Sequence, residues 1–181
     1  MRKVAAVYVF SILTVALAGC TGESPQAPAN PDAGLAIATF DPITAVPEVQ
    51  RNFFAVLSGG EEVPANDAPG RGVAKFQLSE DGLSLHYSLA VANIENVTAS
   101  HIHLAPAGTN GGVVVFLFGP AAPAGPLAGK IAVGTITGAN LINALAGQPL
   151  SVLLDHMNAG NAYVNVHTSQ IPGGEIRGQI R

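Results

Sequence analysis

Three of the five histidines occupy positions from which they could hold one metal ion. His101 and His103 are two residues apart within Val97 to Ala105, a segment predicted to be a strand. Alternate side chains of a strand point to the same side, so both imidazoles face the same way. Imidazole nitrogens are usual ligands of zinc and copper. His167 ends another predicted strand and would complete a three-histidine site if the two strands are neighbours.

The same region also fits a purely structural interpretation. A hydrogen-bonded polar cluster could fix the loops, and its members would be His101, Asn165, His167, Thr168, Glu175 and Arg177. The two-residue spacing of Glu175 and Arg177 favours a shared strand face with partners across the sheet. In the metal interpretation, Glu175, Glu61 or Glu62 could add an oxygen ligand. The sequence leaves the polar cluster and the metal site as alternatives.

Nothing in the chain matches a known catalytic motif. Ser100, Ser169 and the histidines fit no nucleophile pattern such as Gly-x-Ser-x-Gly. The glycines at 111–112 and 173–174 are predicted turns and not phosphate loops, because neither pair opens a helix after a strand. We therefore expect no enzyme, with a metal-dependent redox activity as the minor alternative.

The N-terminus is predicted to be a signal peptide that ends at a lipid attachment site. Arg2 and Lys3 precede the apolar run Val4 to Ala16, which is the layout of a secretory signal. The run is shorter than the roughly 20 residues of a spanning helix. Leu-Ala-Gly before Cys20 resembles the lipobox of bacterial lipoproteins, which implies cleavage before Cys20 and acylation of its thiol. By resemblance to Gram-negative sorting, Thr21 favours the outer membrane or the periplasmic side.

The rest of the chain divides into two parts. Residues 20–50, here called the tether, contain the lipidated cysteine and a Pro/Ala-rich segment predicted to be disordered, because it has little apolar surface to bury. Within the tether, residues 35–40 could form a short edge strand. From about Arg51 short apolar runs separated by turn residues replace the Pro/Ala-rich sequence, so we expect residues 51–181 to form one folded domain.

Composition limits the partners. Removal of residues 1–19 would leave six basic and twelve acidic residues, a net charge of −6. This balance opposes non-specific binding to nucleic acid and adhesion to anionic lipid. Cys20 is the only cysteine, so the exported part would fold without disulfides.

The domain is predicted to be all-β. Short apolar or alternating runs bounded by turn residues are typical of antiparallel strands, and Leu83 to Val91 is the clearest of them. One or two short helices are expected between Asn140 and Met157, with a break at Gly147-Gln148-Pro149. Seven or eight such strands favour an antiparallel β-sandwich or barrel.

Three segments carry a family resemblance. They are Gly60-Glu61-Glu62-Val63-Pro64, His101 to Gly108 followed by Asn110-Gly111, and Tyr163 to Thr168 running into Pro172 to Gln179. Together they resemble a CHRD domain, the module named after chordin and widespread in secreted microbial proteins, over residues 51–181. The family usually has glycine two residues after the second histidine, where this chain has Ala105. The resemblance implies an extracytoplasmic, Greek-key-like β-sandwich with no settled activity.

Three functions are expected from these features of the sequence. The leading one is a lipid-anchored, non-enzymatic binding module of the cell envelope, held by the lipid on Cys20 and contacting an extracellular protein or envelope component. In chordin the module belongs to a protein that binds signalling proteins. The alternative is a copper- or zinc-binding protein that uses His101, His103 and His167. A superoxide-dismutase-like redox enzyme is the least favoured, because that family's further zinc-binding histidines and disulfide cysteines are not found here.

Overall fold

The computed structural model describes residues 49–181, which form an antiparallel all-β domain, as predicted. Its strands are β1 (Asn52–Ser58), β2 (Arg71–Leu78), β3 (Leu85–Glu95), β4 (Val97–Leu104), β5 (Gly112–Phe118), β6 (Pro126–Ile136), β7 (Ala162–Thr168) and β8 (Ile176–Gln179). The one α-helix is α1 (Leu150–Asn158), and 3-10 turns occur at η1 (Gly59–Glu61), η2 (Gly138–Asn140) and η3 (Asn143–Leu145). The predicted signal peptide, Cys20 and residues 21–48 of the tether, including the possible strand at 35–40, lie outside the described residues. Within residues 49–181, no helix is both long and apolar enough to cross a membrane.

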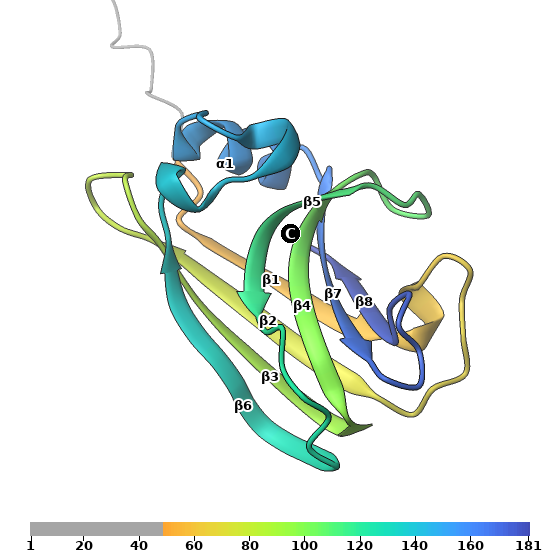
Figure 1. Cartoon of the computed structure of the whole chain (residues 1–181). Coiled ribbons are helices and arrows are strands. Elements are labelled where there is room, and N and C mark those ends of the chain that lie inside the picture. Colours follow the sequence, from red (N-terminus) through yellow and green to blue (C-terminus); the bar gives the residue numbers. More distant parts are fainter. Residues whose placement is uncertain (1–48) are drawn as a thin grey trace, which may run out of the picture. The chain divides into compact units, whose positions relative to one another are not determined.

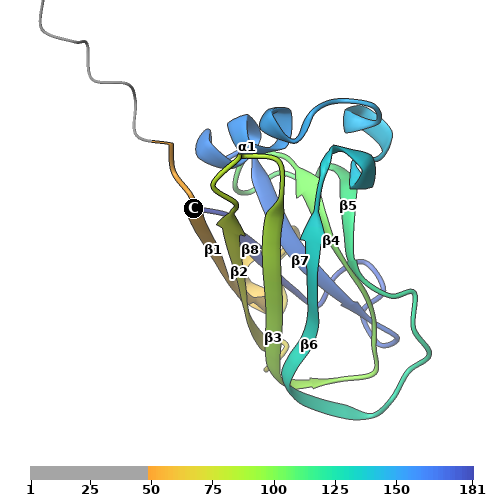
Figure 2. The ribbon, with the colours of Figure 1, turned by 90° about the vertical axis from the view of Figure 1, so that its left-hand side faces the viewer.

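All eight strands belong to one antiparallel sheet that folds over on itself. The strand order is β5-β4-β7-β8-β1-β2-β3-β6. Figure 1 shows β4 and β5 lying in front of β1 and β2, and Figure 2 turns the layer containing β2, β3 and β6 toward the viewer. The Tyr87 hydroxyl on β3 donates to the Leu117 carbonyl of β5 over 2.7 Å, which ties the two layers together. The 3-10 turns η2 and η3 cover one end of the fold together with α1.

The core forms between these layers because the strands alternate. In β1, Phe53, Ala55 and Leu57 are buried while their neighbours are exposed, and β2 has the same period of two. Side chains that alternate across the pleat place every second residue on the inner face. From α1, Leu153 and Met157 add to this core. Burial of aliphatic side chains is the main stabilising contribution to such a domain.

The outer face of β4, β7 and β8 carries polar and aromatic residues in register. His101 pairs with Asn165, and Asn165 pairs with Arg177 on the next strand. Two residues further along β4, His103 pairs with Tyr163 of β7. The intervening residues, such as Ile102 and Val164, point into the core. The sheet therefore places this polar row opposite the core.

Candidate metal centre

Three histidines meet on the outer face of β4 and β7. His101 and His103 lie two residues apart on β4. His167 comes from the end of β7 and pairs with Ala99, two residues before His101 on β4. One ligand nitrogen from each of His101, His103 and His167 lies within 4.8 Å of the other two. With Zn–N bonds of about 2.1 Å, tetrahedral ligand nitrogens are about 3.4 Å apart. The ligand nitrogens of the histidine cluster would therefore have to approach one another by up to about 1.4 Å to bind one ion.

Backbone carbonyls fix which nitrogen of two rings carries hydrogen. His103 Nδ1 lies 2.9 Å from the Gly111 carbonyl, and His167 Nδ1 lies 2.9 Å from the Pro172 carbonyl. A carbonyl only accepts, so both Nδ1 atoms must donate, which leaves the lone pair of a neutral ring on Nε2. Such second contacts orient metal-binding histidines in general. His103 Nε2 is buried and has no hydrogen-bond partner among the described residues.

His101 completes the cluster with its Nδ1 atom 3.1 Å from His167 Nε2. Because His167 Nε2 is an acceptor in the neutral ring, His101 Nδ1–H donates to it in the metal-free protein. A metal ion between the rings would take the place of that hydrogen, and His101 would carry its proton on the other nitrogen. The His101 ring also makes a T-shaped contact with Phe116 of β5, with ring centroids 4.7 Å apart.

Burial and neighbouring groups lower the pKa values of His101 and His103. Burial, together with repulsion from His167 and His103, lowers the pKa of His101 to about 4. Burial also lowers the pKa of His103, which is 8% exposed, and the nearby Arg177 guanidinium acts in the same direction. Metal ions bind imidazole in its neutral form. His101 and His103 are therefore available as ligands at neutral pH without first losing a proton.

Arg177 holds the loop that orients His103. This arginine on β8 is 1% exposed and donates to the carbonyls of Pro106 and Thr109 and to the side-chain oxygen of Asn110. Gly111, at the end of the same loop, supplies the carbonyl that receives the His103 proton. A Cβ on Gly111 would lie 1.9 Å from the Leu104 carbonyl oxygen, so only glycine lets the loop approach β4 this closely.

A stack of three side chains joins Arg177 to the histidine cluster. The Arg177 guanidinium lies 3.5 Å from the centroid of the Tyr163 ring, and Tyr163 stacks on His103 with centroids 4.8 Å apart. The Tyr163 hydroxyl in turn accepts from the Gly111 amide at 3.1 Å. A cation over an aromatic ring is favourable, and more so when desolvated. The stack and the loop together set the position of the His103 ring.

The polar residues singled out in the sequence divide between two faces. Asn165 and Arg177 lie on the face of the histidine cluster, and the Asn165 side chain lies beside His103. Thr168 and Glu175 lie on the other face, where the Thr168 hydroxyl donates to the Glu175 carboxylate over 2.7 Å. Glu61 is exposed. No carboxylate belongs to the metal-ligand group within residues 49–181.

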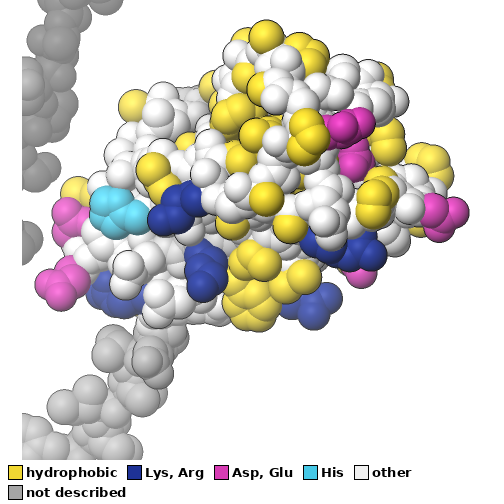
Figure 3. Space-filling view, turned by 90° about the horizontal axis from the view of Figure 1, so that it is seen from below, with side chains coloured by type: hydrophobic (Ala, Val, Ile, Leu, Met, Phe, Trp, Pro, Cys, Tyr) yellow, Lys and Arg dark blue, Asp and Glu magenta, His cyan; other side chains and the backbone are white. Residues whose placement is uncertain are grey.

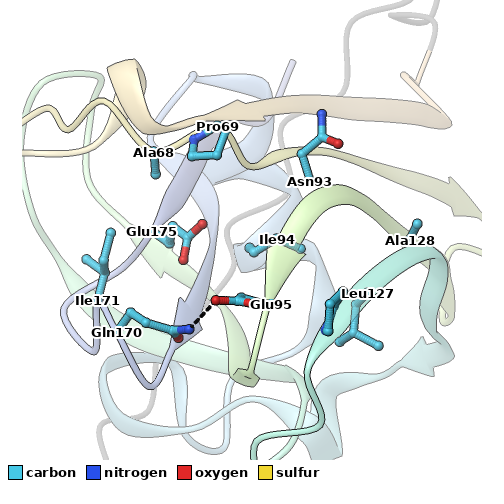
Figure 4. A pocket seen from close by; sticks show the side chains of 11 residues that line it. Ala68, Pro69, Asn93, Ile94, Glu95, Leu127, Ala128, Gln170, Ile171 and Glu175 are labelled. Atoms are coloured by element: carbon cyan, nitrogen blue, oxygen red, sulfur yellow. Dashed lines mark hydrogen bonds between the residues drawn. The ribbon is translucent and has the colours of Figure 1, made fainter.

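Glu175 instead lines a separate pocket of about 590 Å³ at one end of the fold (Figure 4). Pro69, Ile94 and Leu127 supply much of its apolar lining. Gln170 and Glu95 also line this pocket, and Gln170 donates to the Glu95 carboxylate at 3.0 Å, as the dashed line in Figure 4 marks. Glu175 is thus held by Thr168 in a pocket lined mainly by apolar groups and takes no part in the histidine cluster.

Glu62 is a buried carboxyl that the sequence offered only as one of several oxygen ligands. Its Oε1 atom is buried without a hydrogen-bond partner among the described residues. Gly174, with a φ of 128°, lies against it, and a Cβ there would come within 2.6 Å of Glu62 Oε1 and 2.7 Å of Asn165 Nδ2. Burial raises the pKa of Glu62 to about 7, although the positive charge of Arg177 opposes the rise.

Glu62→Gln is expected to remove a pH-dependent loss of stability. The folded protein retains a proton on Glu62 that the unfolded chain releases near pH 4.5, so the free energy of unfolding should fall as pH rises from about 4.5 to 7. With allowance for solvent screening, the fall is about 1–2 kcal/mol. Urea unfolding at pH 5 and pH 8 measures it. The exposed Glu61→Gln is the matched control, and an equal fall in Glu62→Gln and wild type would contradict the assignment.

Comparison with known proteins supports a family assignment. The sequence model of the CHRD domain matches residues 53–180, nearly all of the described domain. No curated protein and no solved structure matches the chain. Ala105, where the family usually has glycine, is accommodated without strain, because the non-glycine residues of positive φ in 49–181 are Asn93, Asn96 and Asn143. The chain belongs to the CHRD domain family.

Proposed function

We propose that this domain binds a transition-metal ion, zinc or copper, through His101, His103 and His167. The observation that carries the proposal is the convergence of three imidazoles whose ligand nitrogens lie within 4.8 Å of one another. The carbonyls of Gly111 and Pro172 support it, since they leave the lone pairs of His103 and His167 on Nε2. Three imidazoles suit zinc and copper and leave a coordination position for water or another ligand.

The proposed role is binding and not catalysis. Among the described residues, the ligand group consists of three histidines and contains no carboxylate, which suits binding of the ion. Neutral His101 and His103 favour uptake of metal at neutral pH. The proposal thus adopts the alternative expected from the sequence, a metal-binding protein whose use is storage, delivery or structural support, in place of the leading expectation of a module that contacts an extracellular protein or envelope component.

The metal test compares retained metal among histidine variants. The chain from residue 20 onward, with Cys20→Ser and no histidine tag, would be exposed to zinc or copper, dialysed and analysed by mass spectrometry. We expect one equivalent of retained metal in the wild-type domain and none in His103→Ala. His86→Gln and His156→Gln are matched controls, because neither histidine belongs to the cluster. A folded wild-type sample that retains no metal would contradict the proposal.

We further propose that the domain acts at the cell envelope, anchored by lipid on Cys20. The support is the lipobox-like Leu-Ala-Gly before Cys20 and the apolar run that precedes it. Because several acyl chains hold a protein firmly, a high-salt, alkaline wash should leave wild type in the membrane fraction and release Cys20→Ser from it. His103→Ala, which leaves the anchor intact, should stay with the membranes. Retention of Cys20→Ser in membranes after a high-salt, alkaline wash would exclude the anchor.

A further inference from the structure

Hydrophobic side chains stand exposed on the outer face of the β1, β2 and β3 layer. Phe54, Val56 and Val73 are 52%, 60% and 37% exposed. They are neighbours, because Val56 pairs with Val73 across β1 and β2 and Phe54 is the next outward residue on β1. Beyond β2 the same row continues through Ala90. A contiguous exposed apolar patch of this kind usually marks an interaction site.

Basic side chains surround this patch. Phe54 pairs with Lys75 on one side, and its backbone exchanges two hydrogen bonds with Arg181 on the other. Lys130 of β6 pairs with Ala90 at the far end of the Val56 row, and Arg71 pairs with Ser58 one row away. We call these seven residues the basic outer face: Phe54, Val56, Arg71, Val73, Lys75, Lys130 and Arg181. Figure 3 shows hydrophobic side chains on this side of the molecule with Lys and Arg side chains on both sides of them.

The cationic side chains of the described domain are concentrated on this face. Residues 49–181 contain six Lys and Arg residues, of which Arg177 is buried and Arg51 donates to the carbonyls of Ser79 and Glu80. The other four all belong to the basic outer face. Glu61 lines the hollow beside Phe54 and Arg181, so one carboxylate stands at the margin. The negative net charge of the chain opposes adhesion to anionic lipid, but this face carries a local excess of positive charge.

We infer that the basic outer face docks on an anionic lipid surface. Exposed Phe and Val side chains can enter the acyl boundary while the flanking cations meet lipid phosphates, which is the chemistry of interfacial membrane binding. Each Lys or Arg held near an anionic surface adds a favourable contribution. The chain that leads from Cys20 enters the domain at β1, which carries Phe54 and Val56. A lipid on Cys20, as proposed above, would raise the effective concentration of the face at the membrane, so weak intrinsic affinity suffices.

The test uses protein without lipid or metal, so it is independent of the proposed anchor and metal site. The chain from residue 20 with Cys20→Ser is sedimented with vesicles of phosphatidylcholine alone or with about one third phosphatidylglycerol. Binding should appear with the anionic vesicles at about 20 mM salt and disappear at about 0.5 M, where screening is nearly complete. His103→Ala should bind the vesicles as wild type does, even if metal binding fails.

Substitutions locate the contact. Lys75→Glu and Lys130→Glu should each weaken vesicle binding by about tenfold or more, and the double variant Phe54→Ser/Val56→Ser should bind less tightly than wild type at equal salt. Leu83→Ser is the matched control, because Leu83 is 68% exposed and lies between β2 and β3, outside this face. The proposal is overturned by equal binding to neutral vesicles or by no binding at low salt. A dimer that Phe54→Ser disperses, in a protein that ignores vesicles, would likewise assign the face to self-association.

Discussion

Zinc or copper at about 100 times its dissociation constant is expected to raise the melting temperature of the domain by roughly 8–10 °C. A ligand that binds only the folded state stabilises it by about 2.7 kcal/mol at that concentration. The three histidines come from β4 and from the end of β7, which are separated by more than sixty residues of chain. The unfolded chain therefore offers no comparable site. For a domain of about 130 residues, each kcal/mol shifts the melting temperature by several degrees.

The useful quantity is the difference between metal-loaded and metal-free melting temperatures. His103→Ala also loses the hydrogen bond to Gly111 and the stack on Tyr163, so its metal-free form should melt lower than wild type. That loss does not bear on the difference, which should vanish in His103→Ala and persist in His86→Gln and His156→Gln. A chelator should reverse the wild-type shift. An equal shift in His103→Ala and wild type would place the stabilising metal elsewhere.

Local sequence patterns were enough to predict the all-β class and most of the strands. The alternation in β1 and β2 directly predicts which residues are buried, because the period of two is a property of the strand itself. The start of β6 was not predictable in the same way, because Pro126 and Gly129 are typical of a loop. β6 is an edge strand that begins at Pro126. Proline is tolerated at the first residue of an edge strand, because the missing N–H costs no hydrogen bond where there is no neighbouring strand. Strand order has no local signature, so the pairing of β4 with β7 had to come from the structure.

For the candidate site, the sequence could predict only which side chains of one strand share a face. His101 and His103 share a side although the β4–β5 ladder is irregular at both of them. Asn165 and Thr168 are three apart on β7, an odd number, so alternation already places them on opposite faces. Glu175 precedes β8, which begins at Ile176, so its two-residue spacing from Arg177 does not imply a shared face. The buried carboxyl of Glu62 has no sequence signal, because distant chain segments bury it.

Arg177→Met is expected to lower the free energy of unfolding by about 3 kcal/mol. The substitution removes three hydrogen bonds from a charged donor to Pro106, Thr109 and Asn110, each of which contributes more than a bond between neutral groups. It also removes the cation that lies over Tyr163. Arg177→Lys should recover part of the loss, because an ammonium keeps the charge but cannot reproduce the planar fork of donors. Urea unfolding at pH 7 measures all three proteins.

Arg51→Met is the matched control for this loss. Arg51 also donates to two backbone carbonyls but is exposed, so its substitution should change stability by no more than about 0.5 kcal/mol. A cost below about 1 kcal/mol for Arg177→Met would mean that the loop at 105–111 is held by other contacts. If Arg177 does hold it, the Gly111 carbonyl loses its fixed position and His103 its orientation. Metal affinity should then fall about tenfold or more in folded Arg177→Met, although Arg177 is no ligand, because the contacts behind a ligand set its geometry.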